Sequence, residues 1–184
     1  MRVETTVLPG VLLVTPEVFS DDRGFFLESF NARTFAAAGL PTAFVQDNHS
    51  RSAAGVVRGL HYQLEQPQGK LVRVVRGAVM GVALDIRVGS PTFGRWTTFR
   101  LDDENHCLVW IPPGFAHGFC ALAEGTDVVY KCTDFYTPSD DRGVFWNDPE
   151  LAIPWPAIAS RVSEKDARYL PLRAPRSDLP VYRP

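Results

Sequence analysis

The feature that most constrains the fold of this chain is the regular spacing of its short apolar segments. These segments are rich in Val, Phe, Thr and Tyr, and they lie between clusters of Gly, Pro, Asn and Asp. Short strands separated by such turn signals predict a β-sandwich or barrel, and the lack of alternating strand–helix units argues against a doubly wound fold. The expected strands are Val11–Thr15, Phe25–Phe30, Ala43–Ser50, Val56–Tyr62, Lys70–Arg76, Ala78–Arg87, Arg95–Leu101, Cys107–Ile111, Gly118–Leu122 and Val128–Thr133.

Helical signals are few, and the clearest begins at Asn31, which can cap a first turn, and stops at Gly39. After Tyr136 the chain becomes rich in proline, so we expect this part to wrap around the strands with short helical turns. The end of the chain, Leu170–Pro184, is dense in Pro and Arg and is expected to be loosely ordered. We expect a single domain over residues 1–184, whose extensions are the N-terminal strands (residues 1–50) and the C-terminal wrap (residues 137–184).

The composition excludes several classes of partner and location. Lys and Arg total 19 against 21 Asp and Glu, so the net charge of −2 gives no electrostatic case for nucleic acid or an anionic membrane. Cys107, Cys120 and Cys132 form no C-x-x-C pair and are expected to be free thiols in a reducing compartment. The N-terminus lacks the apolar core of a signal peptide, and the most apolar stretch is interrupted by Arg76 and Asp85. These features together predict a cytoplasmic protein.

Two compact motifs carry most of the polar chemistry. They are Arg58-Gly59-Leu60-His61-Tyr62-Gln63 with the nearby Gln68-Gly69-Lys70, and Pro112-Pro113-Gly114-Phe115-Ala116-His117-Gly118-Phe119. The second has the P-x-G-x-x-H form of the second motif of a cupin barrel. The first keeps His61 but has Gln63 where a metal-binding cupin has the second histidine of an H-x-H pair. Because His61 and His117 alone are an incomplete set of ligands, we expect no metal.

His61 is a candidate for a general base. It ends an apolar strand, and histidine titrates near neutral pH, so it can take up and return a proton under working conditions. Arg58 and His61 would face opposite sides of a regular strand, but a bulge at Gly59 would bring both into one pocket. The alternative is a structural histidine that bonds to the backbone, and the first motif by itself favours neither interpretation.

Lys70 and His117 are two further candidates at strand ends. Lys70 alternates with Val72 and Val74, so it is expected on the apolar face of its strand, where a lysine requires a ligand or a partner. Its alternative is a solvated lysine at a strand end. His117 follows a tight Pro-Pro-Gly turn, and it is either a binding residue at the mouth of the barrel or a histidine bonded to the chain.

Taken together, these motifs resemble the dTDP-4-dehydrorhamnose 3,5-epimerase family. The resemblance runs in order and in spacing over about residues 2–172, which makes it far more specific than any one motif. Besides the two motifs above, the matching segments are Asp22-Arg23-Gly24-Phe25-Phe26-Leu27-Glu28, Gln46-Asp47-Asn48-His49-Ser50, Asp85-Ile86-Arg87 with Ser90-Pro91-Thr92-Phe93-Gly94, Tyr130-Lys131-Cys132-Thr133, Trp146-Asn147-Asp148-Pro149, Trp155-Pro156 and Ser163-Glu164-Lys165-Asp166.

The resemblance implies a cupin-type jelly roll, mainly β with a few short helices, that works as a homodimer without metal or cofactor. It implies epimerisation of dTDP-4-dehydro-6-deoxy-D-glucose at C3 and C5 to dTDP-4-dehydro-L-rhamnose, in dTDP-L-rhamnose biosynthesis. A C–H bond next to a ketone becomes acidic only if the enolate is stabilised. Such an enzyme therefore needs a base on one side of the sugar, an acid on the other and a cation near the ketone oxygen.

By this resemblance, His61 is the base and Asp166 is its carboxylate partner. Tyr130 is the proton donor, since a phenol with an ordinary pKa near 10 is protonated at neutral pH. Lys70 is the cation beside the C4 oxygen. These assignments rest on the resemblance, because on residue type alone Asp166 is a turn acid and Tyr130 a core aromatic.

The resemblance also implies a set of substrate-binding residues. Arginine is suited to a pyrophosphate because its planar fork bonds phosphate oxygens in pairs, and amide side chains can pair with the edge of thymine. Two aromatic residues of the set are candidates for stacking on the base. The family commonly has Glu at the position of Asp141, so the shorter side chain is a departure. The set is Arg23, Glu28, Gln46, Asn48, Arg58, Lys70, His117, Tyr136, Asp141, Lys165 and Phe19.

Three alternatives remain open at this stage. The first is an enzyme of another deoxysugar pathway that epimerises the same intermediate at C3 or C5 alone, because such a relative shares the proton relay. The second is a metal-dependent cupin, which would require a stoichiometric transition metal. The third is a non-catalytic cupin that binds a sugar. In every case the expected partner is a small molecule, without nucleic acid or membrane.

Overall fold

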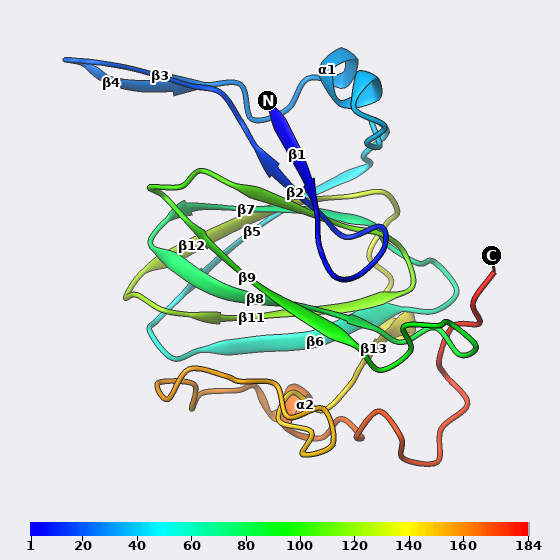
Figure 1. The fold of residues 1–184 in the computed structure, drawn as a ribbon. Helices are drawn as coiled ribbons and strands as arrows, with labels where there is room; N and C mark the ends of the chain where they lie inside the picture. Colours follow the sequence, from blue (N-terminus) through cyan, green and yellow to red (C-terminus); the bar gives the residue numbers. More distant parts are fainter. Residues whose placement is uncertain (184) are drawn as a thin grey trace.

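Two antiparallel β-sheets face each other, and a projecting hairpin and long irregular segments lie outside them (Figure 1). This computed structural model describes residues 1–183. The six-stranded sheet contains, in spatial order, β1 (Arg2–Thr5), β2 (Leu12–Thr15), β10 (Leu108–Ile111), β7 (Lys70–Arg76), β12 (Thr126–Cys132) and β5 (Gln46–Ser52). The five-stranded sheet contains β13 (Asp141–Gly143), β6 (Val57–Gln63), β11 (Phe115–Ala121), β8 (Ala78–Asp85) and β9 (Trp96–Asp102). The hairpin pairs β3 (Val18–Asp21) with β4 (Gly24–Leu27).

The main core fills the space between the two sheets. Side chains alternate along each strand, so every second residue points into this space. On β7, Val72 and Val74 are buried there against Phe99 and Phe119 of the opposite sheet, and Val128 of β12 joins them. The predicted two-sheet arrangement with few helices is therefore confirmed.

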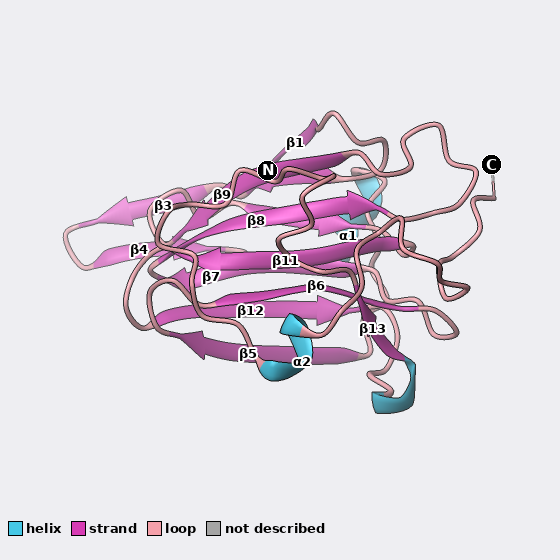
Figure 2. Cartoon of the chain, turned by 90° about the horizontal axis from the view of Figure 1, so that it is seen from below, coloured by secondary structure: helices cyan, strands magenta, loops and turns pink. Residues whose placement is uncertain are grey.

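Different segments cover the outer faces of the two sheets. Helix α1 (Ala32–Ala37) places Phe35 against Leu71 and Trp110 on the outer side of the six-stranded sheet. The chain after β13 packs on the outer side of the five-stranded sheet, where Leu151 and Leu172 join an apolar cluster. This wrap contains α2 (Glu164–Ala167), which lies next to β6 (Figure 2). Each sheet is thus covered on its far side by a segment that is not one of its strands.

The structure confirms the predicted helix and moves some strand ends. The Asn31 side chain accepts hydrogen bonds from the amides of Arg33 and Thr34, and Gly39 follows the helix with a φ of 72°. This is the usual role of Asn at the start of a helix and of Gly after its end. The predicted strand Phe25–Phe30 is too long, because β4 ends at Leu27. Strands β1, β3 and β13 were not predicted.

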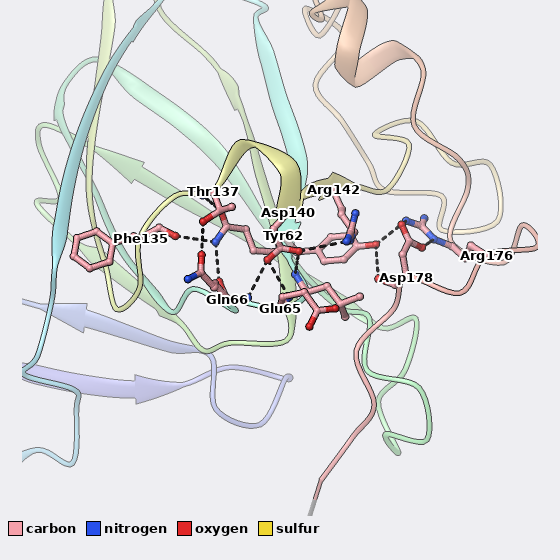
Figure 3. Close-up of polar contacts among 11 residues, drawn as sticks. Tyr62, Glu65, Gln66, Phe135, Thr137, Asp140, Arg142, Arg176 and Asp178 are labelled. Atoms are coloured by element: carbon pink, nitrogen blue, oxygen red, sulfur yellow. Dashed lines mark hydrogen bonds and ion pairs between the residues drawn. The ribbon is translucent and has the colours of Figure 1, made fainter.

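The prediction of a loosely ordered C-terminal segment is wrong for the part that the structure describes. Leu172 is buried, and the Arg176 guanidinium donates to the Tyr62 hydroxyl at 2.6 Å and to the Gly143 carbonyl at 3.0 Å (Figure 3). The amide of Tyr182 donates to the Val88 carbonyl. A proline-rich sequence disfavours regular secondary structure, but its side chains can still anchor it in this way. Pro184 lies outside the described residues.

The three cysteines are free, as expected, with Cys120 and Cys132 buried and Cys107 partly buried. No helix among residues 1–183 is long and apolar enough to cross a bilayer.

Candidate active site

A cavity of about 150 Å³ opens between the two sheets and collects most of the predicted catalytic residues. Larger hollows lie on the surface, but this cavity holds the chemistry because both sheets contribute polar side chains to it. The five-stranded sheet supplies one wall and the six-stranded sheet the other. The lining residues are Arg58, His61, His117, Gly118 and Phe119 on the first wall, and Ser50, Lys70 and Tyr130 on the second.

A bulge in β6 brings two of these residues into the cavity together. His61 lies opposite His117, but Arg58 lies opposite Phe119, so β6 has one residue more than β11 in this interval. The extra residue is accommodated at Gly59, where φ is 132° and an added Cβ would lie 2.5 Å from the Gly118 Cα. Only glycine fits this approach of two backbones. The predicted bulge is confirmed.

His61 forms a dyad with Asp166, a residue 105 positions later in the chain. Its Nε2 lies 2.8 Å from Oδ1 of Asp166, and the other carboxylate oxygen accepts the Gly59 amide at 3.2 Å. Asp166 is buried in α2, and its own amide donates to the hydroxyl of Ser163, the residue that caps this helix. A carboxylate acceptor favours a proton on Nε2, which leaves the Nδ1 lone pair free to act as a base.

The dyad keeps its carboxylate ionised. Burial raises the pKa of Asp166, but the hydrogen bond and charge of His61 and the Gly59 amide outweigh burial, so the pKa lies below its ordinary value. An ionised Asp166 stabilises the imidazolium that forms when His61 takes a proton. The pair can therefore accept a proton from a carbon acid.

The opposite wall carries two polar groups that lack hydrogen bonds to any of residues 1–183. The ammonium of Lys70 lies on the interior face of β7, in line with Val72 and Val74 as predicted, and no carboxylate side chain among residues 1–183 forms an ion pair with it. Burial lowers the pKa of Lys70. Tyr130 faces the cavity from β12, and burial raises the pKa of its phenol, which keeps the phenol protonated. This wall can supply a cation and a proton.

His117 is buried between aromatic rings. Its ring stacks on Phe99 at 6.4 Å between centroids, and its Nε2 has no hydrogen-bond partner among the described residues. Burial and the nearby charges of Lys70 and His61 hold the pKa of His117 well below its ordinary value, so the ring is neutral. An unpaired buried nitrogen at the cavity wall is suited to bonding a ligand.

Five predicted binding residues form one polar rim next to the cavity. The Gln46 amide donates to the Asn48 carbonyl oxygen at 2.9 Å and accepts the backbone amide of Tyr136 at 2.8 Å. The Tyr136 phenol donates to Asp141 at 3.1 Å, and Lys165 pairs with the same carboxylate. The structure thus joins residues from β5, β13, α2 and the segment before β13 into one surface.

Three predicted binding residues lie away from the cavity of their own chain. Phe19 and Arg23 belong to the hairpin β3–β4, which projects from the sheets (Figure 1). The Arg23 side chain is 85% exposed and pairs with Asp21. Glu28 accepts a hydrogen bond from Asn31 at the start of α1. Within one chain, these three residues therefore do not lie beside the other predicted binding residues.

Sequence reasoning missed two residues that the site uses. Ser50 lines the cavity with a buried, unpaired hydroxyl, and it could have been found because it alternates on β5 with Gln46 and Asn48. Ser163 orients Asp166, and its position three residues before that acid is the spacing of a helix cap.

Gln63 points to backbone groups outside the cavity. Its amide bonds to the carbonyls of Gln66 and Phe135 and to the amide of Thr137, in the network drawn in Figure 3. Within residues 1–183, no group of three or more His, Cys, Asp or Glu side chains is arranged to hold a metal ion.

Comparisons with known proteins agree with this geometry. The sequence profile described as dTDP-4-dehydrorhamnose 3,5-epimerase matches residues 5–174. A dTDP-4-dehydrorhamnose 3,5-epimerase from Pseudomonas aeruginosa is 56% identical over 168 residues, which cover 90% of this chain and 93% of that protein. One from Methanothermobacter thermautotrophicus is 50% identical, with 98% and 97% covered. The crystal structure of dTDP-6-deoxy-D-glucose-3,5-epimerase from Legionella pneumophila, in complex with dTDP-4-keto-L-rhamnose, has a TM-score of 0.96 at 46% identity, with 100% and 99% covered.

Proposed function

The chain belongs to the dTDP-4-dehydrorhamnose 3,5-epimerase family, and from this premise we propose how its residues divide the reaction. The enzyme is a cupin-type isomerase of a family that needs no cofactor. It inverts C3 and C5 of dTDP-4-dehydro-6-deoxy-D-glucose, which yields dTDP-4-dehydro-L-rhamnose for dTDP-L-rhamnose biosynthesis. We propose that residues 1–184 act as one domain, with the catalytic cavity between the sheets.

The first half of each inversion takes place at the His61 wall. Nδ1 of His61 removes the proton from the carbon next to the C4 ketone, and the electron pair of that C–H bond moves onto the C4 oxygen as an enolate. Asp166 stabilises the resulting imidazolium. A positioned base of this kind contributes about 10²–10⁴ to the rate.

The second half takes place at the opposite wall. The Lys70 ammonium, which has no carboxylate partner within the described part of the chain, stabilises the enolate oxygen, an effect worth roughly 10²–10³ in rate by analogy with oxyanion-hole donors. Tyr130 then gives its phenolic proton to the other face of the carbon, and the ketone re-forms. Exchange with solvent returns a proton to Tyr130 and removes one from His61, and the sequence repeats at the second carbon.

The single observation that carries this proposal is the placement of base and acid on facing sheets. His61 comes from β6 and Tyr130 from β12, and both line one cavity. Inversion requires a proton to leave from one face and arrive at the other, which one histidine alone could not achieve at the same carbon.

The nucleotide is assigned to the polar rim and the cavity mouth. Arg58 and His117 are the groups for the pyrophosphate. Tyr136, with its ring half exposed, offers a stacking surface for thymine, and the amides of Gln46 and Asn48 offer hydrogen bonds. Asp141 and Lys165 complete this end of the site.

We also propose a cytoplasmic homodimer in which the hairpin β3–β4 reaches the partner. Phe19, Phe25 and Phe26 are between 57% and 68% exposed on this hairpin, an apolar surface that a monomer would not leave in water. Contact with the partner would bring Phe19 and Arg23 to a cavity that is not their own, and Glu28 lies just after the hairpin. Replacing Phe25 and Phe26 with Ser should give a monomer by light scattering, whereas an unchanged dimer would contradict this arrangement.

Proton NMR in D₂O with dTDP-4-keto-6-deoxyglucose tests the function. Deuterium at both C3 and C5 is the expected result. Deuterium at C3 alone would assign the enzyme to the single-carbon alternative, and no incorporation would refute epimerisation. Metal analysis in the same samples separates the metal-dependent alternative, which predicts activity that tracks bound metal.

A further inference from the structure

We propose that Gln63 is a positioning residue that holds Tyr136 at the nucleotide end of the site, an inference that rests on the proposed function. Gln63 is 5% exposed, and both its amide nitrogen and its amide oxygen form hydrogen bonds. Its Nε2 donates to the carbonyls of Gln66 at 2.7 Å and Phe135 at 3.0 Å, and its Oε1 accepts the Thr137 amide at 2.8 Å.

These bonds hold the chain on both sides of Tyr136. Phe135 and Thr137 are its immediate neighbours, and one side chain bonds to both (their surroundings are drawn in Figure 3). Phe135 and Tyr136 are 59% and 49% exposed as residues, so apolar packing contributes little to fixing this segment. Hydrogen bonds must therefore set the direction of the Tyr136 ring.

Gln66, whose carbonyl accepts one of the Gln63 hydrogen bonds, is itself held in place. The buried carboxylate of Asp140 accepts the amides of Leu64, Glu65 and Gln66 at 2.9–3.2 Å. Gln66 is thus fixed independently of Gln63. The amide of Gln63 consequently links a rigid turn to the exposed segment that carries Tyr136.

The chemistry of this position requires an amide. Two backbone carbonyls face Nε2 and one backbone N–H faces Oε1, a combination that only a side chain with adjacent donors and acceptor satisfies. A carboxylate in this place would set its oxygen against two carbonyls, and an apolar chain would leave three partly buried backbone groups without their present partner. This accounts for glutamine at the position where a metal-binding cupin has histidine.

Calorimetric binding of dTDP to the purified protein tests the proposal. We expect Gln63→Glu and Gln63→Met each to weaken dTDP binding about tenfold, because the partly buried hydrogen bonds of the amide are lost, while kcat stays within about twofold. The matched control is Tyr62→Phe, a neighbour on β6 whose hydroxyl bonds Arg176 and Asp178 instead. The control should lower the melting temperature without changing the Kd for dTDP.

A double-mutant cycle with Tyr136→Ala provides the second readout. If Gln63 acts through Tyr136, adding Gln63→Glu to Tyr136→Ala should change the Kd for dTDP by less than about twofold, since interacting sites are not additive. Multiplicative effects, or Gln63 variants that bind dTDP as the wild type does, would overturn the inference. Because dTDP binding needs no turnover, a wild type that binds dTDP but does not epimerise would refute only the proposed function.

Discussion

The two walls of the cavity differ in how far their polar groups are satisfied within the protein. On the five-stranded sheet, His61 is bonded to Asp166, and Asp166 is bonded in turn to two further groups. On the six-stranded sheet, the side chains of Lys70 and Tyr130 have no hydrogen bonds to residues 1–183. The base is held in place before substrate arrives, whereas the cation and the acid have bonding capacity left for the substrate.

This difference follows from what each group has to do. A histidine base must present one particular nitrogen, so it needs a partner that fixes its tautomer and orientation. A lysine that stabilises an enolate gains most if no carboxylate already neutralises it. His117 is the exception on the first wall, since its Nε2 has no hydrogen-bond partner in residues 1–183, which fits a binding role and not a catalytic one.

Removing the base or its carboxylate partner from the first wall should lower kcat the most. We expect His61→Ala to lower kcat by about 10³-fold, and Asp166→Asn by a similar factor because the wrong tautomer would be favoured. Steady-state assays at neutral pH measure this. The control is His49→Ala, which removes another histidine paired with a carboxylate, Asp127, on the outer face of the six-stranded sheet. An equal loss in the control would contradict the special role of the first pair.

Removing the cation from the second wall should have the next largest effect. Lys70→Met has similar length and no charge, and we expect kcat to fall by about 10²-fold through loss of enolate stabilisation. Lys70→Arg should retain more activity than Lys70→Met, because it keeps the charge. Equal activities of the two variants would show that the charge at this position is unimportant.

The same wall should set the alkaline limit of activity. Burial lowers the pKa of Lys70 below its ordinary 10.5, so the cation is lost as pH rises through that lowered value. The pKa of Tyr130 is raised, so its phenol keeps its proton over the same range. A plot of kcat against pH should therefore fall on the alkaline side below pH 10.5. The residual activity of Lys70→Met should not show this fall. An alkaline fall in kcat that persists in the variant would show that another group causes it.

The smallest effect on activity is expected when the hydrogen bond that holds the Asp166 backbone in place is removed. Ser163→Ala removes the cap that accepts the Asp166 amide, which should cost about 1 kcal/mol of stability and lower kcat only a few-fold. Thermal unfolding and kinetics measure the two quantities. Ser160→Ala, which removes an exposed hydroxyl bond to Ile158, should change neither. A kcat loss as large as that of His61→Ala would mean that the dyad depends on the cap far more than its several bonds suggest.

Local patterns in the sequence were sufficient to predict most of the fold. Alternation placed Lys70 on the inner face of β7, and the cap residue Asn31 and the stop residue Gly39 marked the one clear helix. The bulge followed from a glycine between two polar residues that had to face one way. Each of these features depends on residues that are close in sequence, so a single chain contains the information.

What could not be predicted depends on contacts between distant segments. Asp166 meets His61 only because α2 docks beside β6, and without the family resemblance its sequence context indicated an exposed turn. The C-terminal segment was expected to be loose from its content of Pro and Arg. Its anchor, Arg176, has partners more than thirty residues away, which the local sequence does not reveal. Gln63 gave no signal of its role, since all its partners are backbone atoms, whose positions residue types do not reveal.

The most direct test of the division between the walls is deuterium exchange by Tyr130→Phe compared with His61→Ala. Both variants are incubated with dTDP-4-keto-6-deoxyglucose in D₂O and followed by proton NMR. We expect Tyr130→Phe still to exchange hydrogen for deuterium at the acidic carbons but to epimerise poorly, whereas His61→Ala should do neither. Loss of exchange in Tyr130→Phe, or exchange that survives in His61→Ala, would contradict the assignment of base and acid to opposite sheets.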